Sequence, residues 1–253
     1  MSNYFKNFPK VAYRFGNEDQ PVSYQKLSKY VDVIDTLQES ISAYIEYEIR
    51  DFDRPDTLSH RFYGTSEYEW TFFLMNDRLR ESGWPLATQD LYDAAQNDFY
   101  KNYTCKLDIS TADSAALFAN LYSVGQSVLV GDKEGKVVHK DLDLGEIVVS
   151  SDTDLTTSMA ISYIDYDVIP EQPLTVHAPL TNTVYEYEGT HHYENDSGEW
   201  VNIFFDDNTL GTIPKTNLEH LVDQNDQLKR IRIIRKQDIQ AVVAEYKRLM
   251  EIR

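Results

Sequence analysis

The sequence predicts an α+β fold, in which a helical module, a β-rich insert and a C-terminal strand and helix follow an extended N-terminal arm. Three observations predict this class: alternating strand-like and helix-like patterns in residues 44–85, many β-branched and aromatic residues in 111–212, and an apolar helical stripe near the C-terminus. The insert is expected to be a small barrel or a sandwich. The expected divisions are an arm (1–43), the helical module (44–110), the insert (111–212) and a C-terminal segment packing back on the module (213–253).

The first strand is expected at the start of the helical module. Ile45, Tyr47 and Ile49 alternate with charged residues, and this two-residue period is typical of a half-buried strand. Apolar and basic residues alternate in the same way from Leu228 to Ile233. This second predicted strand is a candidate to close the sheet that the first one begins.

The first helix is expected to begin just after the strand. Asp53 is the predicted N-cap, Pro55 lies in the first turn where its missing N–H is not needed, and Asp56 adds negative charge at the positive end of the helix dipole. Leu58 lies on the predicted apolar face, and Gly64 is a suitable left-handed residue to end the helix. The predicted helix is about two turns long.

A second short helix is predicted immediately afterwards. Ser66 and Glu69 have the spacing of a capping box, Trp70 and Phe73 recur at helical spacing, and Asn76 is a plausible C-terminal cap. Helices this short are marginal in water on their own, so their apolar faces are expected to pack against a sheet or another subunit.

Two further helices are predicted later in the chain. Thr88 is a candidate N-cap for a helix over residues 89–101. The final helix carries one apolar stripe, formed by Ile239, Val242, Val243, Tyr246, Leu249 and Met250.

The pattern of residues 44–85 resembles a known module and a known family. A strand followed by D-T-L-x-x-R-F-Y-G and then a Trp and an Asn is similar to the LysM module, which has a strand-helix-helix-strand fold. Together with YFKNFPKVAYRFG, YEWTFFLMND and WPL, the pattern resembles the baseplate wedge protein 53 family of T4-type contractile-tailed bacteriophages. The residues that carry the resemblance are Asp53, Arg54, Pro55, Asp56, Leu58, Tyr63, Gly64, Trp70, Asn76, Trp84 and Pro85.

The resemblance covers about the first 90 residues and, less closely, the C-terminal strand and helix. The chain departs from the family in DFDRPD, where a Gly often follows the first Asp, and in a shortened link, DRLRESGWP. The resemblance implies a structural virion protein of the tail baseplate, which binds neighbouring wedge proteins and bridges adjacent wedges of a sixfold assembly. It implies assembly in the host cytoplasm.

Composition limits the other possible partners. The formal charge of −18 argues against nucleic acid, because affinity for phosphates comes from clustered Lys and Arg. We expect no membrane association, because the sequence has neither a long apolar stretch nor a signal peptide. Cys105 is the single cysteine, so no internal disulfide is expected.

The arm could pack in two ways. Residues 1–43 are rich in aromatic residues and too irregular for a long strand or helix. An aromatic-rich segment of this kind is expected to lie on an apolar surface. Both its own domain and a neighbouring subunit remain possible.

No catalytic site is predicted. Asp206–Asp207 and the pair Glu186 and Glu188 could supply the two carboxylates of a glycosidase. However, Glu186 and Glu188 alternate with tyrosines and are interpreted as the solvent face of a strand, while Asp206–Asp207 is interpreted as a turn. The chain also lacks the P-loop, zinc-protease and nucleophile-elbow motifs. We expect no cofactor and no small-molecule substrate.

One histidine pair is the nearest approach to a metal motif. His191 and His192 lie between Gly189 and Gly198 in a predicted polar hairpin. Adjacent residues of a strand point to opposite faces, so a shared metal ion is not expected.

Two alternative functions remain open. The LysM resemblance also fits a module that binds peptidoglycan or chitin, although such modules are usually exported and repeated. A carboxylate-based cell-wall hydrolase is the third hypothesis.

Overall fold

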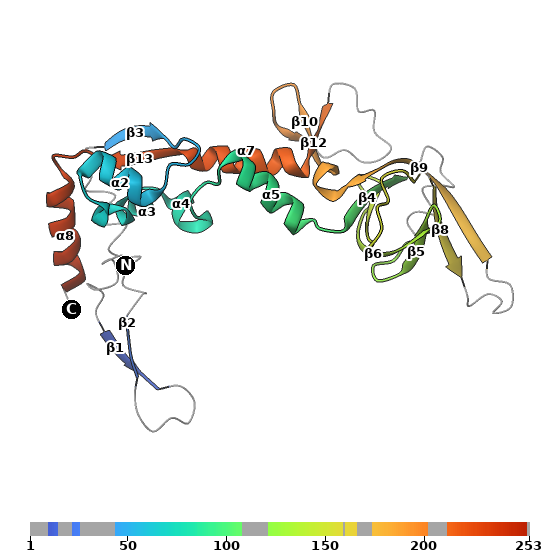
Figure 1. Cartoon of the computed structure of the whole chain (residues 1–253), viewed down its shortest axis with the longest axis horizontal. Helices are drawn as coiled ribbons and strands as arrows, with labels where there is room; N and C mark the ends of the chain where they lie inside the picture. The colour runs from blue at the N-terminus through green and yellow to red at the C-terminus, as the bar shows by residue number, and fades with distance from the viewer. Residues whose placement is uncertain are drawn as a thin grey trace. The chain divides into compact units, whose positions relative to one another are not determined.

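The computed structural model describes residues 10–14, 22–25, 44–107, 121–158, 160–165, 174–201 and 212–251 of the 253-residue chain. Helices and strands are both abundant, which confirms the α+β class (Figure 1). The chain forms two compact units: residues 1–88 with 224–253, called here the terminal unit, and residues 89–223, called the middle unit. These boundaries differ from the expected divisions after residues 110 and 212.

A two-stranded antiparallel sheet forms the centre of the terminal unit. β3 (Tyr44–Glu48) pairs with β13 (Arg230–Ile234), and Tyr47 lies opposite Ile231. The predicted pairing of the first strand with the C-terminal strand is therefore confirmed. The predicted start of the second strand at Leu228 is wrong, because residues 228 and 229 still belong to helix α7 (Asn217–Lys229).

Three short α-helices and one 3-10 turn follow β3. They are α2 (Pro55–Tyr63), η2 (Ser66–Tyr68), α3 (Trp70–Met75) and α4 (Asp77–Ser82). Gly64 ends α2 with a φ of 82°, a left-handed conformation that favours glycine, as the sequence predicted. Helix α4 was not predicted, because its segment was interpreted as a turn.

The caps of these helices differ from the predicted ones. Arg54, and not Asp53, is the N-cap of α2, and the Thr57 hydroxyl accepts a hydrogen bond of 3.2 Å from the Arg54 N–H. The predicted capping box of Ser66 and Glu69 is also wrong. Ser66 begins η2, whose N-cap is Thr65, and α3 begins only at residue 70.

The C-terminal helix completes the core of the terminal unit. Helix α8 (Ile239–Glu251) buries the predicted stripe at residues 239, 242, 243 and 246. The buried core combines the residue after β3, the short helices, β13 and α8: Ile49, Leu58, Tyr63, Phe72, Leu74, Met75, Leu79, Ile231, Ile233, Ile234, Ile239, Val242, Val243 and Tyr246. The sheet of the terminal unit is thus completed by a strand from the other end of the chain.

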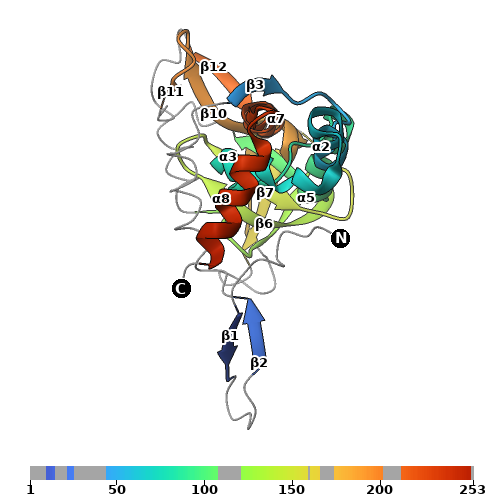
Figure 2. The same cartoon turned by 90° about the vertical axis from the view of Figure 1, so that its left-hand side faces the viewer.

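The described part of the N-terminal segment contains a short hairpin. β1 (Lys10–Tyr13) and β2 (Val22–Gln25) pair antiparallel and lie side by side as a two-stranded ribbon (Figure 2). Each strand has four residues, which agrees with the expectation that no long strand forms here. The remainder of the expected arm lies outside the described residues.

The middle unit begins with helix α5 (Thr88–Asp98), which ends three residues before the predicted end. Six strands follow: β4 (Asn102–Leu107), β5 (Ser127–Val130), β6 (Lys133–Asp141), β7 (Glu146–Ser150), β8 (Ala160–Asp165) and β9 (Leu174–Tyr185). They pair in the closed order β4-β7-β6-β5-β8-β9 and back to β4. Of the barrel and the sandwich expected for the insert, the strand pairing is that of a barrel.

A small three-stranded sheet completes the middle unit. η3 (Glu186–Glu188) leads into β10 (Thr190–Asn195), which pairs with β11 (Trp200–Val201) on one side and β12 (Thr212–Thr216) on the other. The polar hairpin predicted between Gly189 and Gly198 is confirmed as the turn between β10 and β11. α7 follows β12 directly, and this helix was not predicted. In the ranges that the structure describes, no helix has both the length and the apolar character to span a bilayer.

Candidate functional site

Asp53 is the polar centre of the motif that carries the family resemblance. Its carboxylate accepts hydrogen bonds from the Tyr47 hydroxyl (2.7 Å), the Arg61 guanidinium (2.7 Å) and the Arg50 N–H (3.1 Å). Burial by itself opposes ionisation, but the Tyr47 hydroxyl and the two arginine groups outweigh it and lower the pKa of Asp53. The ionised Asp53 side chain therefore links β3 to α2 and does not cap the helix as predicted.

Trp84 reinforces the same junction from the end of the helical segment. Its indole N–H donates a 2.7 Å hydrogen bond to the backbone oxygen of Asp53. Its ring lies 6.0 Å from Phe72 and 5.9 Å from Phe73. Trp84 thus holds the loop between β3 and α2 against α3, and Pro85 beside it is buried.

Asn76 connects the end of α3 to the edge of β13. Its side-chain amide donates to the oxygens of Phe72 (2.7 Å) and Arg232 (2.9 Å), and its side-chain oxygen accepts from the Arg232 N–H (2.8 Å). The predicted C-cap is confirmed. The side chain of Asn76 thus hydrogen-bonds to both backbone groups of Arg232, as a neighbouring β-strand would, and satisfies them.

Tyr63 makes a second side-chain tie to β13. Its hydroxyl donates a 3.0 Å hydrogen bond to the oxygen of Ile234, and burial raises its pKa to about 12. Leu58 is fully buried, whereas Trp70 is half-buried with its ring 4.5 Å from Tyr246. The motif side chains named in these paragraphs form internal contacts.

Arg54, Pro55 and Asp56 form the start of α2, where Arg54 is exposed and the other two are half-buried. Pro55 is the first helical residue, as predicted, and the Arg54 guanidinium lies 3.3 Å from the Asp56 carboxylate. A surface ion pair of this kind contributes little to stability. These three residues therefore shape the helix start and leave charged groups at the surface.

Of the two candidate carboxylate pairs, only Glu186 and Glu188 lie within the described residues. Glu186 and Glu188 lie in the 3-10 helix η3, so the predicted strand is wrong here, whereas Glu188 is exposed to solvent as predicted. Burial raises the pKa of Glu186. Asp206–Asp207 lies outside the described residues. Cys105 is fully buried, and burial raises its pKa to about 12, so its thiol is not ionised at neutral pH.

A small polar pocket lies in the middle unit between the barrel and β10. The Lys106 ammonium lies 3.4 Å from the Glu146 carboxylate and 3.1 Å from the Tyr193 hydroxyl. Burial raises the pKa of Glu146 despite the nearby Lys106. The residues that line this cavity of about 140 Å³ include Thr190, whose side chain hydrogen-bonds to Glu146. The arrangement is that of a buried ion pair stabilised by a tyrosine.

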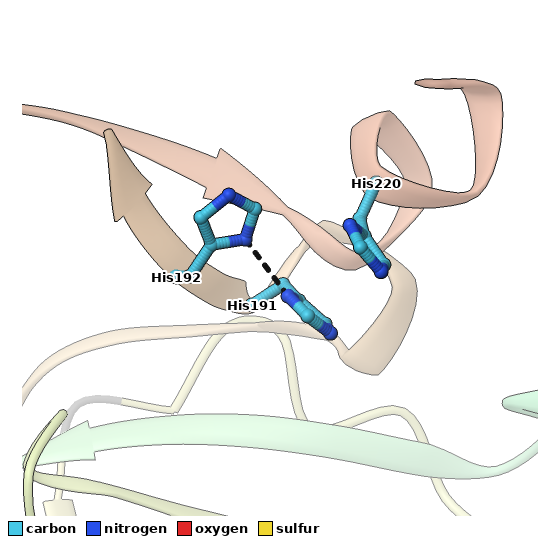
Figure 3. Close-up of side chains that lie close together, drawn as sticks. All are labelled: His191, His192 and His220. Carbon is cyan, nitrogen blue, oxygen red and sulfur yellow. Dashed lines mark hydrogen bonds between the residues drawn. The ribbon is translucent and has the colours of Figure 1, made fainter. Parts of the chain in front are cut away.

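The histidine pair is the place where the structure most clearly overturns a prediction. The pairing of β10 with β12 shifts between Thr190 and His192, so His191 is an extra residue in a β-bulge. The bulge brings the Nδ1 atoms of His191 and His192 to 2.8 Å (Figure 3). The prediction that the two rings point to opposite faces is therefore wrong.

A third histidine joins this pair from α7. The His220 ring stacks on His191 at 3.9 Å, with an angle of 13° between the ring planes, and lies 5.5 Å from His192 (Figure 3). Trp200 of β11 stacks on His192 at 4.3 Å. Sequence reasoning missed His220 because α7 was not predicted. No local pattern connects it to residues almost thirty positions earlier.

The surroundings of His191 and His220 favour their neutral forms. Burial, followed by the neighbouring histidines, lowers the pKa of His191. Burial also lowers the pKa of His220. The Nε2 atom of His192 lies 3.2 Å from the Glu194 carboxylate. Neutral imidazoles offer one nitrogen lone pair each, so the cluster has the chemical character of a ligand set.

No protein-family model matches the sequence, and no curated protein matches it.

Proposed function

We propose that the protein is a structural subunit of the baseplate wedge of a contractile phage tail. In this proposal it binds neighbouring wedge proteins, bridges adjacent wedges of the sixfold baseplate and catalyses no reaction. It assembles in the host cytoplasm and resides in the virion. The sequence resemblance of residues 44–85 supports the proposal, as does the use of Asp53, Tyr63, Asn76 and Trp84 in internal ties.

The observation that carries the proposal is the apolar face of the β1–β2 hairpin. Val11 lies opposite Tyr24, and Tyr13 lies opposite Val22, so all four side chains share one face of the ribbon. Their exposed fractions are 40%, 44%, 56% and 42% in that order. The opposite face carries Lys10, Ala12 and Ser23.

This face has the properties of a surface that binds another protein. A two-stranded hairpin is marginally stable in water and gains stability when its apolar face is covered. Tyrosine is enriched at protein interfaces, because its ring supplies contact area and its hydroxyl remains polar. We infer that the hairpin adds its aromatic face to a neighbouring wedge protein.

The test is co-expression with candidate baseplate wedge proteins from the same genome, followed by size-exclusion chromatography. The intact chain is expected to co-elute with at least one of them. The double substitution Val11→Ser with Tyr24→Ser is expected to weaken the complex at least about tenfold, which corresponds to about 1.4 kcal/mol. The matched control, Lys10→Ser with Ala12→Ser, alters the other face and is expected to retain binding.

Two results would contradict the proposal. One is an intact chain that stays monomeric beside every wedge protein. The other is saturable heat on titration with chitin oligomers, which would favour the glycan-binding alternative that the LysM resemblance suggests. Cell-wall zymography addresses the hydrolase alternative, because clearing that is lost on replacement of an Asp or Glu would establish catalysis.

A further inference from the structure

We propose that His191, His192 and His220 form a binding site for a divalent transition-metal ion such as Zn²⁺. Three imidazole nitrogens would supply the protein ligands, and a water molecule or a group from a partner would fill the fourth position. The site lies wholly in the middle unit and is independent of the proposed baseplate function.

The distances fit such an ion after small movements of the rings. One ligand nitrogen from each histidine can be chosen so that all three lie within 4.8 Å of one another. Zinc–nitrogen bonds are about 2.0–2.1 Å long, so two nitrogens on one tetrahedral ion lie about 3.3 Å apart. The Nδ1 atoms of His191 and His192 are already 2.8 Å apart. The stacked His191 and His220 rings need only turn until their nitrogen edges converge (Figure 3).

Glu194 prepares His192 to be a ligand. If the Nε2–H of His192 donates to the Glu194 carboxylate 3.2 Å away, the lone pair of His192 lies on Nδ1. That nitrogen faces His191. Histidines that bind metals commonly donate their second N–H to a carboxylate, which fixes the tautomer and the ring orientation. Glu194 is therefore a positioning residue for the site.

The surroundings also favour a metal ion. His192 is 6% exposed and stacked on Trp200, whereas His191 and His220 are half-buried, so an ion can enter from their side. Imidazole ligands suit zinc, copper and nickel, while magnesium and calcium prefer oxygen ligands.

A bound ion would connect two elements that are separate in the sequence. Residues 191 and 192 lie on β10, and residue 220 lies in the first turns of α7. The ion would cross-link the bulge to the helix and stabilise the small sheet. This is the role of a structural metal site, and the fourth position leaves it open to a ligand from a partner.

The test uses the full-length chain, purified without a histidine tag and stripped with a chelator. Isothermal titration with Zn²⁺ is expected to show one ion per chain. Titration with Co²⁺ is expected to give the visible absorption of a tetrahedral ion with nitrogen ligands. Zn²⁺ is expected to raise the midpoint of thermal unfolding and to slow hydrogen exchange in residues 190–195 and 217–223.

Two substitutions at half-buried ligands test the assignment. His191→Ala and His220→Ala are each expected to weaken Zn²⁺ binding at least about tenfold. His220→Gln keeps a polar side chain on α7 and is expected to have the same effect, which protects the test against a folding defect of the alanine variant. His139→Ala, at an exposed histidine of β6, is the matched control and is expected to bind like the unaltered chain.

Three outcomes would overturn the proposal. The first is no stoichiometric uptake of Zn²⁺ or Co²⁺, which would make the cluster an aromatic stack only. The second is unchanged binding in His191→Ala and in both His220 variants. The third is an equal response to Mg²⁺, which would show that the imidazoles do not select the ion.

Discussion

The two compact units close a small β-structure in different ways. In the middle unit, each of six strands pairs with two neighbours, so the backbone groups of the barrel satisfy one another. In the terminal unit, β3 and β13 pair only with each other among the described strands. There, Asn76 and Tyr63 provide side-chain hydrogen bonds to the backbone of β13.

The difference shows why the family-like motif is rich in polar and aromatic residues. A barrel core can be built from aliphatic side chains, as at Val130, Val137 and Ile147, each of which is 0% exposed. A two-stranded sheet must also fix its helices and loops by specific side-chain bonds. The terminal unit is therefore expected to be more sensitive to loss of a distant segment or a single polar group.

The largest expected effect comes from removing the segment after Lys229. This truncation keeps all of α7 but deletes β13 and α8, which supply seven of the fourteen residues in the terminal core. We expect the terminal unit to lose its cooperative folding, because its whole stability is on the order of 5–15 kcal/mol. Hydrogen exchange should show residues 44–85 unprotected and the barrel strands still protected. Equal loss of protection in the barrel would contradict the comparison.

The next-largest effect is expected from one substitution in the core of each unit. Phe72→Ala removes a fully buried ring from the terminal core and is expected to cost about 3–5 kcal/mol. Ile147→Ala in the barrel is expected to cost about 2–5 kcal/mol. Each should lower the unfolding transition of its own unit in differential scanning calorimetry.

Trp70→Ala is the graded control for this pair of substitutions. Because the Trp70 ring is only half-buried, its removal should lower the free energy of unfolding by less than Phe72→Ala does. If both substitutions in the cores shifted a single common transition, the two units would be one cooperative structure.

The smallest effect tests the polar junction at Asp53. Asp53→Asn removes the charge that accepts from Tyr47 and Arg61, and is expected to cost about 1–2 kcal/mol, with the exposed Arg61 contributing least. Because folding lowers the pKa of Asp53, its contribution is complete above about pH 4 and is lost as the pH falls through the folded-state value.

The free energy of unfolding, measured by urea titration between pH 3 and 7, checks this prediction. The Asp53→Asn protein should lose less stability than the unaltered chain below about pH 4. Identical pH profiles would show that Asp53 does not contribute through its charge.

The sequence predicted those elements whose signals are local. Gly64 ends α2, Asn76 ends α3, and the stripe from Ile239 to Tyr246 faces the core. The pairing of β3 with β13 could also be predicted, because both strands show a clear two-residue period. These features follow from backbone geometry and burial that each segment determines largely by itself.

Other features depend on partners far away in the chain. α7 was missed because its interior carries polar residues, and Asn225 shows how they are accommodated. Asn225 is 6% exposed and exchanges two hydrogen bonds, of 2.8 and 3.0 Å, with the backbone of Leu86. A buried amide of this kind breaks the apolar periodicity from which helices are predicted.

The cluster of three histidines could not be predicted for a related reason. The two-residue period of a strand places the side chains of His191 and His192 on opposite faces. A bulge adds one residue to β10 and brings the two side chains together instead. No residue near His191 indicates that a bulge forms there. In the same way, Asp53 was predicted to cap α2, whereas its carboxylate bonds to Tyr47 on β3, six residues earlier in the chain.

The terminal unit is built from two segments that lie far apart in the sequence, and this affects how it can fold during synthesis. A ribosome releases residues 44–88 early, but their β-strand partner begins only at residue 230. Domains generally fold as units during translation, so the middle unit can acquire its structure while the chain is still growing. The terminal unit can be completed only after β13 and α8 have been synthesised and have left the exit tunnel. Until then its apolar helices are a natural substrate for chaperones.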